Sequence, residues 1–403
     1  MFDPHCLSVY VLVLMPVLAQ KQGLDPAGPI GDSDKFLRMG KDAIPQHYIV
    51  VLDTDADVAN GDFARTARNA NELMANYGGA ISSIYSHAIN GFSAQMPEEQ
   101  ALKLSQDPRV KFVEEDSVMQ ASVVTQSNPP WGLDRIGQAA LPLNGAYSYT
   151  TTGSGVNVYI IDTGIRRTHT QFGGRAFAAF DAVGDGQNTN DCNGHGTHVS
   201  GTVGGSTYGV AKSVRLFAVR VLNCSGSGSN SGVIAGVDWV TANHASPAVA
   251  NMSLGGGVSS ALDTAVRNSI ASGVTYAVAA GNSNTDASTS SPARVSEAIT
   301  VGSSTQTDAR SSFSNFGSVV DIFAPGSSIL SSWNTSDTAT ATLSGTSMAT
   351  PHVAGVAARF LQSNPSASPA TVRNEIVNAA NLNRLSGIPS GTANRLLLWS
   401  SSR

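Results

Sequence analysis

Short continuous apolar runs alternate with helical patterns along most of the chain after residue 130. Uninterrupted apolar runs are typical of parallel strands that are buried on both faces of a sheet. Segments 230–244 and 259–273 between them have helical character, and the second ends at Gly273. We therefore predict a doubly wound α/β domain, a parallel sheet flanked by helices, whose ligands bind beyond the carboxyl ends of the strands. The expected strands are 156–162, 214–222, 247–254, 274–281 and 297–304.

A smaller unit with a different order of elements precedes this domain. Four short β-rich runs are interrupted by two segments of helical character, the second of which opens with Pro97, a residue favoured in the first turn of a helix. The order β-α-β-β-α-β is that of a small α+β ferredoxin-like sandwich. The predicted strands are 46–53, 79–86, 91–96 and 110–116, and the predicted helices are 62–77 and 97–104.

The segments that flank these units have compositions of their own. Residues 7–19 form an apolar run that is too short for a membrane span, which needs about 20 apolar residues, but suits a signal peptide over 1–22. The opening residues MFDPHC are atypical of a leader, because they include no lysine or arginine. Residues 23–43 are a predicted linker, and the nearly uncharged stretch 117–130 is a second one that a protease could enter.

Charge is divided unevenly along the chain. The 403 residues are 41% hydrophobic and 13% charged, a globular balance, and the formal net charge is −5. Residues 1–121 carry a net charge of −7 and residues 122–403 carry +2. This change of sign indicates two units with separate roles, and neither is basic enough to favour nucleic acid as a partner.

The three cysteines indicate one disulfide. Cys6 lies within the predicted signal peptide, which leaves Cys192 and Cys224 as a pair in an exported chain. In the loop-entropy model, the disulfide would stabilise the fold by about 3–4 kcal/mol, because it closes a loop in the unfolded chain. The alternative is that both residues are buried free thiols.

Two candidate functional residues lie near the start of the predicted parallel sheet. Asp162 ends the first strand, where it could orient a partner side chain or simply cap the next turn. His195 lies between two glycines at the start of a predicted helix. Cys192, His195 and His198 have spacing compatible with zinc ligands, but the segment has no HExxH pattern, and a disulfide would consume the cysteine.

Two further candidates lie later in the chain. Asn282 follows a strand, where its amide could donate to a developing oxyanion or merely shape a turn. Ser347 opens a helix, where it could be a nucleophile beside unpaired N–H groups or only an N-cap. The surrounding sequence approaches the GxSxG elbow of α/β-hydrolases, but that fold needs a histidine well downstream. Only His352 follows, five residues later, so this interpretation fails.

Acid, histidine and serine therefore occur in the order Asp, His, Ser, with an amide between the last two, which is the order of subtilisin. The motifs that surround them resemble those of subtilases, specifically the proteinase K and aqualysin branch, and the resemblance covers nearly all of residues 125–398. The unit at 44–121 resembles the subtilase propeptide, an intramolecular chaperone and inhibitor. The motifs are IIDTGI (160–165), NGHGTHVSG (193–201), ANMSLGGG (250–257), AVAAGN (277–282), SGTSMATPHVAG (344–355) and WGLDRIGQ (131–138).

The resemblance implies a role for each candidate residue. Ser347 would attack the peptide carbonyl, His195 would take its proton and pass it to the leaving amine, and Asp162 would hold the imidazole. The Asn282 amide and the Ser347 N–H would bind the oxyanion. The resemblance further implies a subtilisin-like fold for residues 124–403.

The resemblance also implies where a peptide substrate binds. The substrate would lie as an extended strand between two edge segments, in the β-augmentation mode. Small, uncharged walls would favour apolar or aromatic P1 residues and broad specificity, and Asn230 stands where proteinase K has a larger aromatic residue. The edge segments are Gly226-Ser227-Gly228 and Ser253-Leu254-Gly255, and the S1 wall is Ala279-Ala280-Gly281.

Structural calcium is the usual cofactor of the family. Asp321, with the carbonyl oxygens of Ser296 and Ala298, matches one site by resemblance. A second set is Asp134, Gln138 and Asn144, although Gly137 replaces an acid that some relatives have. Asp181, Asp185 and Asp191 could bind a cation or face solvent. Ser288 and Val319 occupy the region where relatives carry a second disulfide, so that bridge is not expected.

The sequence thus predicts a secreted, extracellular serine endopeptidase made as a zymogen, cleaved around residues 121–124 and acting as a monomer. Its partners would be protein and peptide substrates and its own propeptide. Binding to nucleic acid is not expected, nor is binding to a membrane once the leader has been removed. The rival hypotheses are a non-catalytic secreted binding protein on the same fold and a zinc hydrolase.

Overall fold

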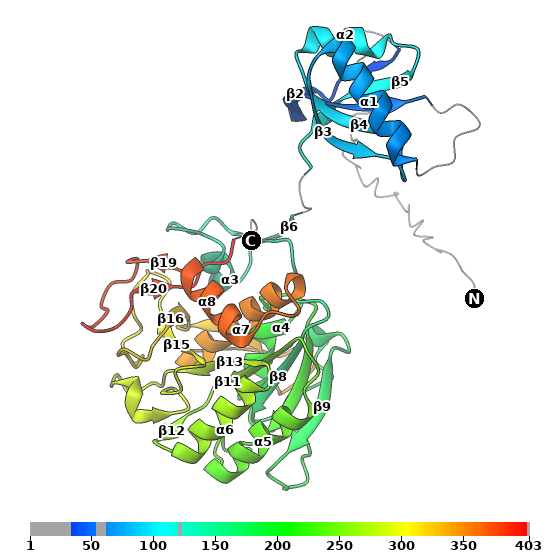
Figure 1. The fold of residues 1–403 in the computed structure, drawn as a ribbon. Helices are drawn as coiled ribbons and strands as arrows, with labels where there is room; N and C mark the ends of the chain where they lie inside the picture. Colours follow the sequence, from blue (N-terminus) through cyan, green and yellow to red (C-terminus); the bar gives the residue numbers. More distant parts are fainter. Residues whose placement is uncertain (1–33, 54–61, 120–122, 401–403) are drawn as a thin grey trace, which may run out of the picture. The chain divides into compact units, whose positions relative to one another are not determined.

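The computed structural model describes residues 34–53, 62–119 and 123–400 (Figure 1). The chain divides into two compact units, Met1–Gln120 and Ala121–Arg403. The predicted signal peptide over 1–22 lies outside the described residues. No helix within the described residues is both long and apolar enough to cross a membrane.

The smaller unit is a five-stranded sheet in the order β1-β5-β2-β4-β3, with two helices. Strands β5, β2, β4 and β3 are antiparallel neighbours, which confirms the ferredoxin-like arrangement. The short strand β1 was not predicted, because it falls in the segment expected to be a linker. It is held by the buried ring of Phe36, which packs on Tyr48. The elements are β1 (Phe36–Leu37), β2 (Ala43–Leu52), α1 (Phe63–Tyr77), β3 (Ala80–Tyr85), β4 (Gly91–Gln95), α2 (Glu98–Ser105) and β5 (Val110–Ser117).

The larger unit is built on a nine-stranded sheet in the order β19-β20-β16-β15-β13-β11-β8-β10-β9. All neighbouring strands pair in parallel except β19 and β20, which confirms the doubly wound class. The strands are β8 (Asn157–Asp162), β9 (Ala176–Asp181), β10 (Arg215–Arg220), β11 (Ala248–Met252), β13 (Val274–Ala279), β15 (Ile299–Ser304), β16 (Ile322–Pro325), β19 (Asn381–Leu382) and β20 (Arg395–Leu396).

Helices cover both faces of this sheet, as Figure 1 shows for α5 and α6 on one side and α7 on the other. The interior strand β8 is fully buried, and its side chains alternate between two cores. Val158 and Ile160 belong to the core beneath α4 and α7, whereas Tyr159 and Ile161 belong to the core beneath α5 and α6. The helices are α3 (Trp131–Ile136), α4 (His195–Gly204), α5 (Asn230–Asn243), α6 (Ser260–Ala271), α7 (Thr346–Ser363) and α8 (Pro369–Ala379).

The predicted linker 117–130 is partly wrong. Val124–Ser127 forms strand β6, which pairs antiparallel with β7 (Ala146–Tyr149). Cross-strand pairing imposes this structure on a segment without its own apolar period. Four short strands complete the unit, namely β12 (Gly256–Gly257), β14 (Ser290–Ser291), β17 (Ile329–Ser332) and β18 (Thr340–Leu343).

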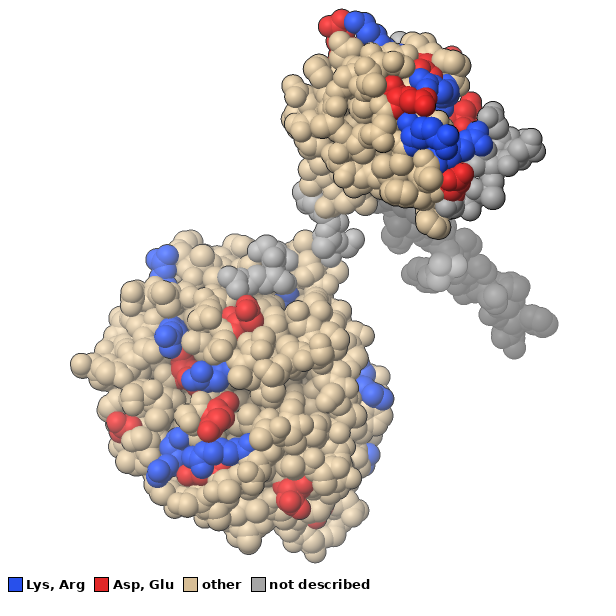
Figure 2. Space-filling view, viewed as in Figure 1, with Lys and Arg blue, Asp and Glu red and all other residues tan. Residues whose placement is uncertain are grey.

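Charged side chains are sparse on the face of the larger unit seen in Figure 2. They lie singly or as small groups of mixed sign, and most of that face is uncharged. An extended basic patch, the electrostatic footprint of a nucleic-acid-binding surface, does not occur on this face.

Candidate active site

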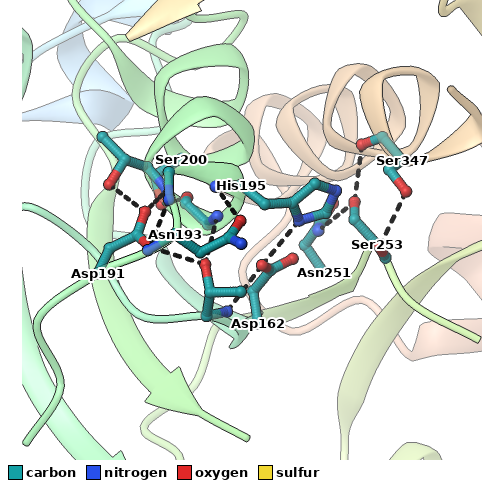
Figure 3. A network of polar contacts seen from close by, with 12 residues as sticks. Asp162, Asp191, Asn193, His195, Ser200, Asn251, Ser253 and Ser347 are labelled. Atoms are coloured by element: carbon teal, nitrogen blue, oxygen red, sulfur yellow. Dashed lines mark hydrogen bonds and ion pairs between the residues drawn. The ribbon is translucent and has the colours of Figure 1, made fainter. Parts of the chain in front are cut away.

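The sheet and helix α4 bring the first two candidate residues together. Asp162 ends β8 and is fully buried, and His195 begins α4. The Asp162 carboxylate accepts hydrogen bonds from His195 Nδ1 at 2.8 Å and from the Thr163 N–H at 2.7 Å. Figure 3 shows the imidazole lying between Asp162 and Ser347. The imidazole is thus held in one orientation, and no side chain or backbone group of the described residues forms a hydrogen bond with its other nitrogen, Nε2.

Electrostatics favour the protonated form of His195. Burial by itself would lower the pKa of His195, but the charge and hydrogen bond of Asp162, together with the charge of Asp191, raise that pKa above the ordinary value of 6.5. An imidazole in this setting can accept a proton and be stabilised as a cation, which is what a general base requires.

Ser347 is the second residue of α7, in the turn whose N–H groups have no partner inside the helix. Its hydroxyl donates to the Ser253 carbonyl at 2.9 Å, and the Ser253 hydroxyl donates to the Ser347 carbonyl at 2.8 Å. Within the described residues, no hydrogen bond joins Ser347 to His195. A rotation of the serine side chain would redirect its oxygen, and such contacts often tighten only when substrate binds.

The Asn282 side chain lies beside the same helix start. Its oxygen accepts hydrogen bonds from the N–H and the hydroxyl of Thr346, at 2.8 and 2.9 Å. Because both donors lie on the oxygen side, the amide NH₂ is directed the other way. Asn282 and Ser347 line one cavity of about 340 Å³. Sequence reasoning missed Thr346, although it directly precedes Ser347 in the GTS motif.

A second cavity of about 540 Å³ adjoins the first, because Leu254, Gly255 and Gly256 line both. His195 lines the larger cavity, together with the two predicted edge segments. Apart from that histidine, no titratable side chain among the described residues lines either cavity. The predicted substrate residues in the larger cavity are Gly226, Ser227, Gly228, Ser253, Leu254 and Gly255.

The predicted S1 wall lines the smaller cavity, where Ala279 and Ala280 are buried. Ala280 is fixed in the sheet through its N–H, which donates to the Val301 carbonyl, and its carbonyl, which accepts from Asn315. A wall of small residues at the end of β13 (Val274–Ala279) gives the cavity an uncharged side. Asn230 lines the larger cavity.

The predicted disulfide is present between Cys192 and Cys224, with 4.9 Å between their Cα atoms. It removes Cys192 from the alternative zinc set, since a half-cystine offers no thiolate. His195 Nδ1 is bonded to Asp162, and His198 Nε2 lies 3.0 Å from the Ile329 carbonyl. Asp185 lies beside the two sulfur atoms, and two of the three members of this cluster are oxidised. The residues therefore do not fit zinc.

The first predicted calcium set does not offer calcium an open group of ligands. One oxygen of Asp321 accepts from the Arg373 guanidinium at 2.5 Å, and the other accepts from the Thr300 N–H at 2.8 Å. The Ala298 carbonyl also accepts from Arg373, at 3.3 Å, and Ser296 is exposed. A cationic side chain thus occupies the place where the ion would have to bind.

The side-chain oxygens of Asp134 and Asn144 in the second predicted calcium set also accept hydrogen bonds from the protein. Asp134 is buried, and its carboxylate accepts from the Gln138 amide and, at 2.8 Å, from the Gly145 N–H. Asn144 points its oxygen at the Ala146 N–H. These contacts satisfy the carboxylate with neutral donors. Neither predicted set of residues fits calcium as it is placed.

The three acids before the histidine motif have separate surroundings. Asp181 and Asp185 pair with the buried guanidinium of Arg220, at 3.2 and 2.6 Å. Asp191 is only 8% exposed and accepts from backbone and hydroxyl donors, so it neither faces solvent nor presents a free carboxylate to a cation.

Comparison with known proteins identifies the family. The subtilase family model matches residues 153–395, and the peptidase inhibitor I9 model matches residues 47–122. The chain belongs to the subtilase family. It is a subtilisin-type serine protease with an I9 propeptide, of the proteinase K and aqualysin kind, as the motifs predicted.

Individual relatives agree with this assignment. The chain is 49% identical to an extracellular serine proteinase of Thermus sp. (strain Rt41A), over 97% of this chain and 98% of that protein. It is 51% identical to alkaline serine exoprotease A of Vibrio alginolyticus, over 88% of this chain and 67% of that protein. The solved structure of a cold adapted subtilisin-like serine proteinase is 56% identical, with a TM-score of 0.66, and matches 68% of this chain and 98% of that one.

Proposed function

We propose that this subtilase is a secreted endopeptidase that hydrolyses peptide bonds through Asp162, His195 and Ser347. The observation that carries the proposal is the bond from His195 Nδ1 to the buried Asp162, with Ser347 on the other side of the imidazole (Figure 3). A buried acid, an oriented base and a hydroxyl at a helix start are the parts that acyl transfer requires.

The proposed reaction begins when the Ser347 oxygen leaves the Ser253 carbonyl and turns toward His195. The hydroxyl attacks the scissile carbonyl carbon while His195 takes its proton. The imidazolium, held by Asp162, then gives that proton to the leaving amine, and an acyl-enzyme remains. Water, activated by the same imidazole, attacks the ester and releases the second product.

Two donors would bind the oxyanion that forms in this sequence. One is the Asn282 NH₂, whose direction is set by the two bonds from Thr346 to its oxygen. The other is the Ser347 N–H, in the first turn of α7. Donors that are already oriented lower the barrier because they need no reorganisation as charge develops.

The substrate is proposed to lie as an extended strand between Gly226–Gly228 and Ser253–Gly255. Both segments line the larger cavity beside His195. The P1 side chain would enter the smaller cavity along Ala279–Gly281, where no charged residue lines the wall. An uncharged pocket excludes a charged side chain, which would lose its hydration without gaining a partner. We therefore propose apolar and aromatic P1 residues.

The order of segments is proposed to be that of a self-processed zymogen. Residues 1–22 would be the signal peptide, 44–121 the inhibitory propeptide and 124–403 the peptidase. The I9 match over 47–122 supports the middle assignment, and the extracellular relative supports export. Self-cleavage would fall between the two units, around residues 121–124.

The test compares wild type with Ser347→Ala by intact mass and N-terminal sequence. We expect wild type to be trimmed to a new terminus near Val124 and the variant to keep its propeptide. Equal trimming of both would show that another protease matures the chain. If neither is trimmed and wild type cleaves no casein, the rival hypothesis of a binding protein replaces this one.

Inhibition gives an independent test of the nucleophile. A serine-directed phosphonyl reagent should add its mass to the peptide that contains Ser347 and abolish hydrolysis. A zinc-selective chelator should have no effect. The reverse pattern would favour a zinc hydrolase. Peptide nitroanilides that differ only at P1 should rank phenylalanine and leucine above arginine and glutamate.

A further inference from the structure

A second buried acid lies behind the Asp162–His195 pair. Asp191 is 8% exposed, and its carboxylate accepts five hydrogen bonds from four residues. Within the described part of the chain, no lysine or arginine forms an ion pair with it. The donors are the Thr163 hydroxyl at 2.9 Å, the N–H groups of Asn193, Gly194 and Thr197 at 2.9, 2.8 and 2.9 Å, and the Thr197 hydroxyl at 2.6 Å.

These donors come from two separate parts of the chain. Thr163 directly follows the last residue of β8, whereas Thr197 belongs to the first turn of α4. The Thr163 hydroxyl also accepts from the Gly196 N–H at 2.9 Å, and the Thr163 N–H donates to Asp162. A continuous network therefore runs from Asp162 through Thr163 to Asp191 and into α4, as Figure 3 shows in part.

Asp191 accepts a hydrogen bond from the Thr197 N–H in the first turn of helix α4. The two preceding N–H groups of the helix donate to the Asn193 carboxamide and the Thr163 hydroxyl. The N-cap residue is Gly194, which has no side chain to cap the helix. Asp191 supplies one of the missing acceptors, and its negative charge lies at the positive end of the helix dipole. The Gly194 backbone has φ of 114°, and a Cβ there would lie 2.5 Å from the Trp333 ring, so the capping acceptors must come from other residues. Asp191 accepts hydrogen bonds from both Thr197 and Thr163, and these bonds connect the start of α4 to the end of β8.

We propose that Asp191 and Thr163 are positioning residues that hold His195 in register with Asp162. The proposal rests on the function proposed above for Asp162 and His195. Asp191 itself acts only through other groups. If the link is cut, α4 and β8 are still joined by packing, but the His195 imidazole can shift by a fraction of an ångström, and misplacements of about 1 Å cost on the order of 100-fold in rate.

The first experiment removes the bridging hydroxyl and keeps the charge. Thr163→Val should lower kcat by about 10-fold or more, with KM changed less than about threefold, in enzyme counted by titration with a phosphonyl reagent. Thr163→Ser, which restores the hydroxyl, should recover most of the loss. The matched control is Thr202→Val in α4, because Thr202 is buried and, among the described residues, its hydroxyl bonds only to the His198 carbonyl. That variant should retain wild-type kcat.

The second experiment removes the charge with Asp191→Asn. Two other titratable side chains act on His195, namely Asp162 and His198. Arg166, which pairs with Asp337, and Arg167 line a surface cavity together with Asp191. Loss of one negative charge lowers the pKa of His195, so the acidic limb of kcat/KM should move to lower pH by about half a unit. Thr163→Val, which keeps the charge, should leave that limb in place.

The outcomes separate the inference from the function on which it rests. The proposal is overturned if Thr163→Val and Thr202→Val have equal kcat. It is also overturned if Thr163→Val lowers only the melting temperature and leaves kcat unchanged, because the hydrogen-bond network would then have a purely structural role. Should Thr163→Val not fold, Thr197→Val cuts the same network from the helix side and decides by the same comparison. A wild type that neither hydrolyses peptides nor reacts with the phosphonyl reagent would instead refute the proposed function.

Discussion

The Asn282 carboxamide oxygen accepts two hydrogen bonds from Thr346, the residue directly before Ser347. An amide has one acceptor end and one donor end, so occupation of its oxygen determines where the NH₂ points. The Thr346 hydroxyl in turn accepts from the Gly281 N–H at 3.2 Å. Strand end and helix start are thereby joined at the cavity that Asn282 and Ser347 share.

Asn282→Ala should lower kcat by about 100–1000-fold while KM changes little, because the lost hydrogen bond forms only as the oxyanion develops. Steady-state kinetics on a peptide nitroanilide, normalised to titrated active sites, provide the measurement. The control is Thr300→Val, which removes a buried hydroxyl that donates to the Ala293 carbonyl. A rise in KM at constant kcat would mean that Asn282 contributes to ground-state binding.

The pH–rate profile should report His195. Its pKa is raised above 6.5, mainly by Asp162 acting against burial, and only the neutral imidazole can accept a proton. The acidic limb of kcat/KM should therefore lie above pH 6.5, with activity lost as pH falls through it. Asp162→Asn should move that limb to lower pH and reduce kcat by about 10⁴-fold. An unmoved limb would assign it to another group.

Stability should fall in mild acid because of two buried histidines. Burial lowers the pKa of both His198 and His352 to about 4. His198 Nδ1 has no hydrogen-bond partner among the described residues, so its added proton would find no acceptor. Both values lie below the ordinary 6.5, so the unfolded chain binds more protons in this window and stability drops as pH falls from about 6.5 toward 4.

The loss should be on the order of 2 kcal/mol per histidine by pH 5. Urea unfolding of the phosphonyl-blocked enzyme at a series of pH values measures it. His198→Gln and His352→Asn keep the donor nitrogen that each native ring presents, toward Ile329 and Met348 respectively. In the double variant the pH dependence should flatten. The same slope in both proteins would place the acid-sensitive groups elsewhere.

Removal of the disulfide should destabilise the peptidase unit. Cys192 and Cys224 are 32 residues apart, for which loop entropy predicts about 3–4 kcal/mol, or roughly 10 °C in Tm. Calorimetry of the phosphonyl-blocked Cys192→Ser, Cys224→Ser double variant tests this. Reduction of wild type with dithiothreitol should produce a similar decrease. A Tm within about 2 °C of wild type would show that neighbouring contacts constrain the loop without the bond.

Arg373 should make calcium unnecessary at Asp321. The guanidinium holds both the Asp321 carboxylate and the Ala298 carbonyl. We therefore expect the melting temperature of the blocked wild type to change little between chelator and millimolar calcium. Arg373→Met uncovers the carboxylate, and its melting temperature should rise with calcium. A strong calcium dependence in wild type that disappears in Arg373→Met would show that arginine and ion act together.

Element prediction succeeded where burial and local pattern agree. Strand β8 was expected over 156–162 and runs over Asn157–Asp162, because a strand buried on both faces must be apolar throughout. Val124–Ser127 was not recognised, since a short strand stabilised by cross-strand hydrogen bonds needs no apolar period of its own. Strand β1 (Phe36–Leu37) was also not predicted, because two residues are too short a run to show a period.

The sequence alone determined the fold class and the candidates Asp162, His195, Asn282 and Ser347, because strand ends, helix starts and their motifs are local properties of the chain. Only the tertiary structure showed that Arg373 covers Asp321 and that Asp191 is buried beneath α4. The partner that covers Asp321 lies 52 residues away, and the bond that ties Asp191 to the end of β8 comes from Thr163, 28 residues away. A carboxylate looks the same in sequence whether a cation, a helix end or water satisfies it, and packing decides among them.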